Sequence, residues 1–208
     1  MPTHPEPATE PPRRRADAAR SIARILDAAL DALASDPDAS MAEIARRARV
    51  VRATIYVHFP TRDALVDAVR QRAMHEVGAT IDAAAPERGD ATDALRRVLT
   101  STWRELGRYH ALVAITTQLP HAEVRSKHHS VLARLEPLIV RGQADGSFRS
   151  DVPASWHLSM LMAVIHAASA ELQAARVHDG QAEDALVRTV LGAICDPPGA
   201  HPDGPLND

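Results

Sequence analysis

Residues 40–62 bring together the kinds of side chain with which a protein bonds nucleic acid. The segment reads SMAEIARRARVVRATIYVHFPTR, and its part from 41 to 62 holds five arginines and one carboxylate, a net charge of +4. Hydroxyl, imidazole and guanidinium groups can each bond a phosphate oxygen, and an arginine fork fits the O6 and N7 atoms of guanine. The segment therefore offers contacts to phosphates and base edges, provided that the surrounding elements present them on one surface.

The whole-chain charge does not oppose this interpretation, because it is unevenly distributed. The 208 residues sum to −3, but residues 78–208 alone hold twelve basic and sixteen acidic side chains, a net charge of −4. The acidic balance thus belongs largely to the C-terminal part of the chain. A local basic surface remains for a nucleic-acid partner.

Composition argues against several other classes of protein. A single cysteine excludes a disulfide scaffold and a multi-cysteine metal centre. An aromatic content of 3% disfavours the stacking platforms of single-strand and RNA-binding modules. No glycine-rich phosphate loop or paired catalytic motif occurs, so we expect no enzyme, no cofactor and no metal. The first fifteen residues lack the apolar stretch of a signal peptide, and the longest apolar run is too short to cross a membrane, so we expect a cytoplasmic protein without a membrane partner.

Hydrophobic spacing near 3.6 residues, interrupted by prolines, predicts an all-α fold of roughly nine helices. The predicted helices cover residues 16–35, 41–48, 51–58, 61–77, 92–109, 111–119, 121–144, 153–177 and 182–195. Gly146 is the predicted stop after the seventh of them. Both ends of the chain are rich in proline and poor in apolar residues, so we expect them to be disordered.

Two of these helices lie within the basic segment and form a helix-turn-helix pattern. Ser40 and Glu43 make an S-x-x-E capping box that starts a helix at Met41. Ile44 faces inward from this helix and Ile55 faces inward from the next one. Two short helices joined by a turn of three or four residues, the second with a polar outer face, form a unit that can place a helix in the major groove of DNA.

Residues 44–65 read IARRARVVRATIYVHFPTRDAL. They resemble the pattern I-A-x-x-A-G-V-S-x-x-T-L-Y-x-[YH]-F-x-[ST]-K-x-x-L of the TetR/AcrR family of transcriptional regulators, and the resemblance extends over about residues 17–77. The sequence departs from it at Arg49, where the family has a turn glycine, and at Val51, where it has serine or threonine. Ala53 and Val57 make the second helix more apolar. A left-handed Arg49 would cost about 1 kcal/mol, and Val51 removes a helix cap.

This resemblance implies a homodimeric repressor whose recognition helix enters the major groove of a palindromic operator in double-stranded DNA. It places three base-facing residues on that helix, Arg52, Ala53 and Thr54, and three phosphate-binding residues beside them, Tyr56, His58 and Arg62. Ser40 and Met41 stand at a helix start, where backbone N–H groups can meet phosphate. The implied organisation is a disordered tail over 1–12, a three-helix DNA-binding domain over 13–77, a helical ligand-binding and dimerisation domain over 78–196, and a disordered tail over 197–208.

The predicted regulatory domain holds a few polar side chains among many apolar ones. This composition suits a pocket for a small, largely apolar effector that releases the repressor from its operator. The predicted effector contacts are Trp103, Tyr109, His110, Gln118, Trp156, His157, Met160 and His166. For each of them, packing in the core or at a dimer interface is the alternative. The effector must favour a conformer in which the recognition helices are wrongly spaced, because a ligand shifts only an equilibrium between states that it binds differently.

The last two predicted helices are apolar on more than one side, so each must be covered twice. The two-helix-per-subunit dimer bundle of the family accounts for the second cover. The predicted dimer interface consists of Trp156, Met160, Ala163, Ala167, Leu186, Val190 and Ile194. Dimerisation would place the two recognition helices about one turn of DNA apart, ~34–36 Å.

Three alternatives stay open at the level of sequence. The chain could be a family member that binds a partner or a ligand without binding DNA, or it could be an enzyme of unfamiliar type. His121, His128 and His129 lie near the start of one predicted helix and could hold a metal ion, with solvated histidines as the plainer interpretation.

Overall fold

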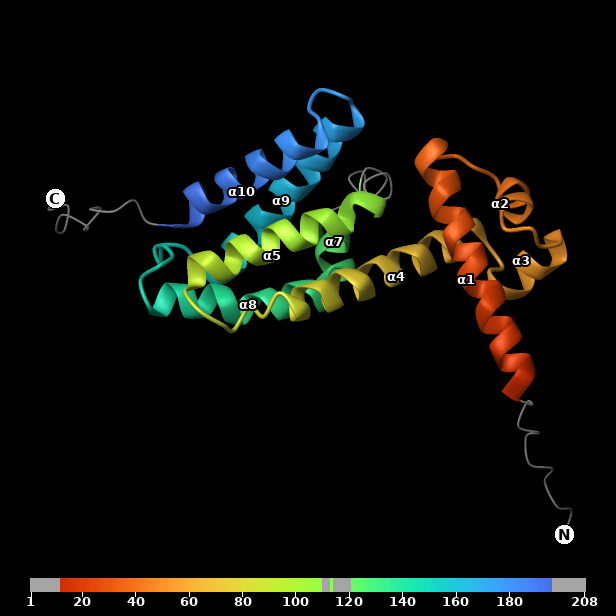
Figure 1. The fold of residues 1–208 in the computed structure, drawn as a ribbon, viewed down its shortest axis with the longest axis horizontal. Coiled ribbons are helices and arrows are strands. Elements are labelled where there is room, and N and C mark those ends of the chain that lie inside the picture. The colour runs from red at the N-terminus through yellow and green to blue at the C-terminus, as the bar shows by residue number, and fades with distance from the viewer. Residues whose placement is uncertain (1–11, 110–112, 114–120, 196–208) are drawn as a thin grey trace, which may run out of the picture. The chain divides into compact units, whose positions relative to one another are not determined.

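The computed structural model describes residues 12–109, 113 and 121–195, and within them it contains helices and no strands (Figure 1). The helices are α1 (Pro12–Ser35), α2 (Met41–Arg47), α3 (Arg52–His58), α4 (Arg62–Ala83), α5 (Ala91–Leu106), the 3₁₀ turn η1 (Gly107–Tyr109), α7 (His121–Lys127), α8 (His129–Ala144), α9 (Ala154–Gln173) and α10 (Asp179–Ile194). The predicted all-α fold is confirmed.

The chain divides into two compact units, Met1–Arg70 and Gln71–Asp208, and the division falls within α4. In unit 1, α2 packs against both α1 and α3. The core that they share is aliphatic: Ile25 and Leu33 of α1, Ile44 of α2 and Ile55 of α3 are at most 1% exposed. Because these side chains recur at helical spacing, burying them fixes which face of each short helix remains outside.

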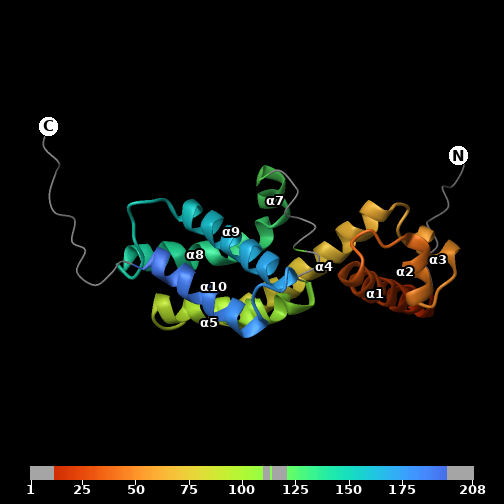
Figure 2. The same cartoon turned by 90° about the horizontal axis from the view of Figure 1, so that it is seen from above.

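Unit 2 is built of antiparallel helices, with α9 and α10 side by side and α5 and α8 packed against them (Figures 1 and 2). The indole N–H of Trp103, near the end of α5, donates to Asp179 at the start of α10, 3.0 Å away. The N–H of Arg149, after α8, donates to the carbonyl of Ile194 at the end of α10, at 2.9 Å. The C-terminal end of α5 therefore lies beside the N-terminal end of α10. The segment that follows α8 lies beside the C-terminal end of α10.

Several helix boundaries differ from the sequence-based expectation. Helix α1 begins at Pro12 and not at 16, α9 ends at Gln173 and not at 177, and α10 begins at Asp179 and not at 182. Residues 121–144 form two helices, because the N–H of His128 bonds the carbonyl of Arg125 in a tight i→i−3 turn at 3.3 Å that interrupts the α-helical ladder. Helix α4 runs on to Ala83, well past residue 77, and α5 gives way to the 3₁₀ turn after Leu106. The helix predicted over 111–119 lies outside the described residues except for residue 113. The predicted stop is observed: α8 ends at Ala144, followed by Gly146 at φ +79°.

Candidate functional site

The turn between α2 and α3 closes through a Schellman motif with an arginine at its left-handed position. The N–H of Val50 donates to the carbonyl of Ala45 at 3.1 Å, and the N–H of Arg49 donates to the carbonyl of Arg46 at 3.2 Å. These are the two bonds of that motif, which requires a left-handed residue after the helix cap. Arg49 occupies that place with φ +54°. An arginine thus adopts the conformation that usually selects glycine.

Helix α3 follows this turn and presents its polar and small side chains to the outside. Ile55 is fully buried, whereas Arg52, Ala53 and Tyr56 are exposed. Val51 stands at the N-cap position with no side-chain cap bond, as the sequence led us to expect. The helix is therefore held in place by Ile55 and by the turn before it, and its outer face is available for contact.

The structure adds two details to this outer face, a contact between Arg52 and Tyr56 and the high exposure of the two valines. The guanidinium of Arg52 lies over the Tyr56 ring, 5.6 Å from its centroid, which gives the arginine a preferred direction one turn along the helix. Val51 and Val57 are 70% and 78% exposed. Exposed apolar groups beside an arginine suit a base edge that carries a thymine methyl. The two valines stand out in the sequence, whereas the contact between Arg52 and Tyr56 gave no signal there.

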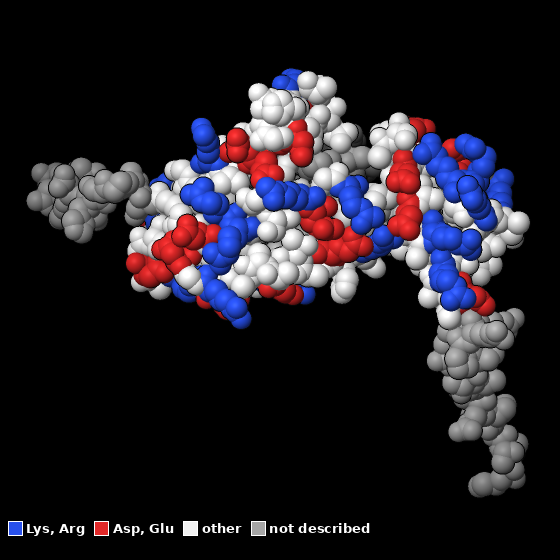
Figure 3. All heavy atoms as spheres, in the orientation of Figure 1, with Lys and Arg blue, Asp and Glu red and all other residues white. Residues whose placement is uncertain are grey.

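Two of the arginines of unit 1, Arg46 and Arg47, are paired with the same carboxylate. The carboxylate of Glu43 accepts from Arg46 at 2.7 Å and from Arg47 at 2.9 Å, and the bonds to Arg47 and then Arg46 lower the pKa of Glu43. Ser40 caps α2 by accepting from the N–H of Glu43 at 3.2 Å. Arginine side chains gather over unit 1 in the space-filling view, and unit 2 shows both signs intermixed (Figure 3).

The other predicted DNA contacts take different positions. The side chain of Met41 is buried, so only its backbone could meet phosphate, whereas Ser40 is exposed. Thr54 and His58 are half-buried. Arg62 donates to the carbonyls of Pro37 and Ala39, in the loop before α2. The prediction for Arg62 is therefore revised: its guanidinium holds the start of α4 to that loop, which positions the helix-turn-helix.

Unit 2 contains a cavity of about 570 Å³, its open mouth included. The cavity is lined by α4, α5, α8 and α9 and by Val113, and its described lining is aliphatic or thioether apart from Thr102, His128 and His166. His166 is the one predicted effector contact among the described lining residues. A largely apolar lining with a few polar groups is usual for small-molecule sites.

The remaining predicted effector contacts lie elsewhere or outside the described residues. Trp103 is bonded to Asp179, and the Tyr109 hydroxyl donates to Glu76, which also pairs with Arg72 at 2.8 Å. Both rings are 1% exposed, and neither is among the cavity's lining residues, so their predicted roles are revised to packing and cross-linking of helices. His110 and Gln118 lie outside the described residues.

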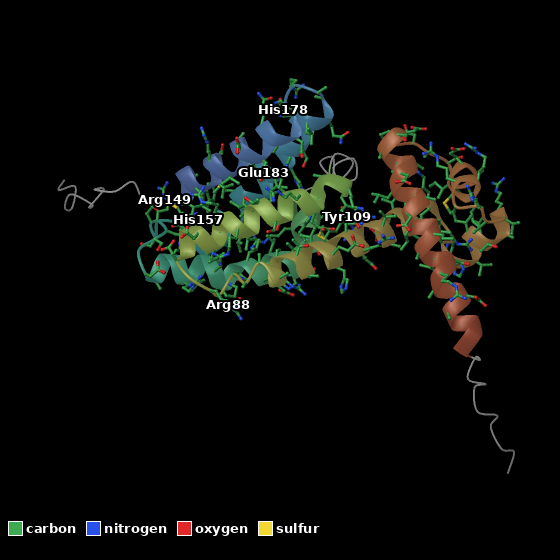
Figure 4. All side chains as sticks on the ribbon, viewed as in Figure 1. Arg88, Tyr109, Arg149, His157, His178 and Glu183 are labelled. Carbon is green, nitrogen blue, oxygen red and sulfur yellow. The ribbon has the colours of Figure 1, made fainter. Side chains whose placement is uncertain are left out.

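Another hollow of unit 2 collects three more of the predicted residues. Trp156, His157 and Met160 line it together with residues near the ends of α8 and α10. The ring of His157 is buried and its Nε2 lies 3.0 Å from the carbonyl of Arg149 (Figure 4). His157 therefore fastens the start of α9 to the preceding loop, and we revise its predicted effector contact to this structural role.

Comparison with known proteins identifies the family of the DNA-binding unit. The model of the family described as "Bacterial regulatory proteins, tetR family" matches residues 25–69, which span α1 from Ile25, α2, α3 and the start of α4. The chain belongs to the TetR family. Its helix-turn-helix is that family's DNA-binding element, and the chain is a DNA-binding transcriptional regulator.

Relatives and solved structures extend the likeness beyond the DNA-binding unit. The HTH-type transcriptional regulator NfxB of Pseudomonas aeruginosa is 28% identical over 151 residues, 69% of this chain and 78% of NfxB. The HTH-type transcriptional repressor LfrR of Mycolicibacterium (Mycobacterium) smegmatis is 38% identical over 82 residues, 39% of this chain and 43% of LfrR.

Two solved structures share the fold over most of the chain. The structure of LfrR in complex with proflavine has a TM-score of 0.66 at 24% identity, covering 86% of this chain and 98% of that one. The structure of FadR from Bacillus subtilis in complex with stearoyl-CoA also has a TM-score of 0.66, at 22% identity, covering 82% and 95%. At these identities the likeness shows the fold alone.

The predicted dimer residues of this TetR-family chain fall into two groups. Trp156 is 62% exposed, Ala163 and Ala167 are exposed, and Met160 is half-buried, all on α9. Leu186, Val190 and Ile194 of α10 are at most 1% exposed. Their assignment to the interface was wrong, because α5 and α9 of the same chain already cover that face of α10.

The structure bears on the predicted histidine cluster and on membrane-spanning helices. No group of three or more His, Cys, Asp or Glu in the described part of the chain could hold a metal ion. His128 is buried, 8% exposed, against the ring of His166, so the interpretation of solvated histidines was wrong for this residue; His129 is exposed. The His121 side chain lies outside the described residues.

Among the described helices, none has the length and apolar character that a membrane crossing requires.

Proposed function

We propose that the chain represses transcription as a homodimer on a palindromic operator and that a small, largely apolar effector releases it. The observation that carries the DNA-binding part is the surface made by the Arg49 turn and the outer face of α3. It combines exposed cations, a stacked Arg52–Tyr56 pair and exposed valines on a short helix fixed by the buried Ile55. Of the relatives, LfrR is named a repressor, which supports the sign of the regulation.

On this proposal, α3 is the recognition helix. Arg52, Ala53 and Thr54 would face base edges, with Arg52 directed to a guanine and the small groups to thymine methyls. Tyr56 and His58 would bond phosphates, and backbone N–H groups at Ser40 and Met41 would add a further phosphate contact. Arg49 adds a cation at the edge of this surface that the family resemblance did not supply.

Alanine substitutions test this surface. Arg52→Ala should weaken binding to the operator about five- to 150-fold, since a good bidentate base contact contributes about 1–3 kcal/mol. Tyr56→Ala should weaken it as well, because it removes a phosphate contact. Arg88→Ala removes an exposed arginine of unit 2 and serves as the matched control for lost charge. Gel-shift titrations at one fixed salt concentration measure all three. Equal affinity of Arg52→Ala, Tyr56→Ala and Arg88→Ala would refute the assignment.

The dimer would form through the outer faces of α9 and α10. Several exposed residues on these neighbouring helices are small or flat, which would let a second pair of helices approach: Trp156, Ala163 and Ala167 on α9, and Ala185, Thr189 and Gly192 on α10. Arg188 is exposed beside those of α10. A 62% exposed tryptophan at one end of this face is costly in water and would be covered in a dimer.

A charge placed in the middle of this face tests the dimer. Ala163→Arg should convert the dimer to a monomer in sedimentation equilibrium, because the charge would be buried without a partner. Ala133→Arg, at an exposed position of α8, is the control and should leave the oligomeric state unchanged. A monomeric wild type, or a dimeric Ala163→Arg, would contradict the proposed interface.

The cavity of unit 2 would hold the effector. LfrR is seen with proflavine and FadR with stearoyl-CoA in the structures that share this fold, which supports a ligand site in unit 2 here. Met74, Val77 and Ile81 of the cavity lining belong to α4, the helix whose first turns belong to unit 1. A ligand that binds better when α4 is displaced would shift the population away from the DNA-binding conformer.

A further inference from the structure

The polar residues of the cavity's described lining gather toward one end of it, where Leu106 and Ile165 line it too. Thr102 lies in the C-terminal half of α5, His128 at the start of α8 and His166 in the second half of α9. Because α5 and α9 run opposite to α8, these three positions lie at the same end of the bundle (Figure 1). Val98, Leu135 and Leu161 line the cavity toward the other end.

Thr102 supplies the strongest indication of a ligand. Thr102 is 7% exposed, and its hydroxyl is buried without a hydrogen-bond partner in the described part of the chain. A buried hydroxyl that lacks a partner destabilises a protein by about 1–3 kcal/mol, so such groups are rare. This hydroxyl belongs to a residue that lines the cavity, where an oxygen of a bound molecule could satisfy it.

The two histidines complete the polar end. The rings of His128 and His166 meet edge to face with their centroids 5.7 Å apart. A neutral imidazole carries one donor and one acceptor, as a hydroxyl does, so the two rings add uncharged polar groups beside Thr102. Both rings also take part in interactions within the chain.

The described lining holds no Asp, Glu, Lys or Arg. Burying an ion without a partner of opposite charge costs far more than burying a neutral polar group. The described lining also holds no Phe, Tyr or Trp, so a flat aromatic ligand would have no indole or phenyl face to stack on. Flexible aliphatic side chains, two methionines among them, suit a flexible aliphatic ligand.

We propose that the effector class is an uncharged aliphatic molecule with one hydroxyl or carbonyl head, its head at Thr102 and the histidine pair and its tail among Val98, Leu135 and Leu161. This inference rests on the proposed function, in which the cavity is the effector site.

Three probes with the same ten-carbon chain test the class by isothermal titration: 1-decanol, decanoate and decyltrimethylammonium. We expect 1-decanol to bind at least tenfold more tightly than either ion. Equal or tighter binding of decanoate or of the cation overturns the proposal, and so does the absence of binding by 1-decanol.

Thr102→Val tests the position of the head. The substitution removes the unsatisfied hydroxyl, so we expect the free protein to melt about 2–4 °C higher while its affinity for 1-decanol falls about three- to tenfold. Thr100→Val, two residues along α5 at a position that does not line the cavity, should do neither. Unchanged affinity in Thr102→Val would place the head elsewhere and overturn the proposal.

Operator binding separates this proposal from the function on which it rests. A Leu135→Trp variant fills the apolar end of the cavity and should lose 1-decanol binding, and a retained operator affinity shows that it has folded. If 1-decanol binds wild type, as proposed, but leaves its operator affinity unchanged, the ligand class stands and the effector function fails. If an ion binds and releases the operator in wild type but not in Leu135→Trp, the effector function stands and the proposed class is wrong.

Discussion

Arg49→Gly should stabilise the helix-turn-helix, although it removes a basic side chain from the proposed DNA surface. Arg49 holds φ +54° at the left-handed position of the Schellman turn. A left-handed conformation destabilises the folded state by about 1–2 kcal/mol for any residue with a side chain, and glycine relieves this. Glycine is also more flexible in the unfolded chain, which offsets roughly 0.5–1 kcal/mol of the relief. The Arg49 side chain is exposed, so its loss removes little packing. The expected net gain is therefore about 0.5–1 kcal/mol.

Native-state hydrogen exchange measures this gain in unit 1 itself. The amide of Val50 is bonded within the turn and that of Phe59 closes α3 on the carbonyl of Ile55. Their protection should rise about two- to fivefold in Arg49→Gly, the equivalent of the expected gain. The matched control is Arg46→Gly, the same exchange inside α2, which should lower protection because glycine in a helix costs about 1 kcal/mol. A fall in protection in both variants would refute the reasoning from backbone conformation.

Two predictions concern unit 2. Burial and then the hydrogen bond to Glu76 raise the pKa of Tyr109 from 10.0 to about 12. The folded state therefore holds this proton more tightly than the unfolded state. The contribution of Tyr109 to the free energy of unfolding is complete below pH 10 and is lost between pH 10 and 12. Urea unfolding followed by tryptophan fluorescence should show this loss in wild type and not in Tyr109→Phe. Gly142→Ala should lower stability by about 1–3 kcal/mol, because a Cβ there would overlap the Phe148 ring, whereas Gly107→Ala, which meets open space, should not; equal melting temperatures for the two variants would contradict this packing argument.

The sequence predicted the local features of unit 1 better than the assignment of faces in unit 2. Arg49 and Val51 stand out against a short pattern whose turn and cap have fixed geometric demands, so their consequences could be stated in advance. The apolar stripe of α10 that includes Leu186 and Ile194 was correctly identified as buried, but periodicity does not say which neighbour covers a face, and α5 and α9 of the same chain proved to cover it. Thr102 gave no signal in sequence, because a missing hydrogen bond depends on neighbours from other helices.

Selection of bound sequences from a random pool of double-stranded DNA, using the purified full-length chain, tests the central claim most directly. The proposal predicts an enriched palindrome whose half-sites have centres about 10–10.5 base pairs apart or a multiple of that spacing, the repeat required by two recognition helices on one face of DNA. It also predicts that Arg52→Ala loses the enrichment and that Arg88→Ala keeps it. A pool that yields no enriched sequence with the wild-type chain, or one that yields the same sequence with Arg52→Ala, would contradict the claim that α3 reads an operator.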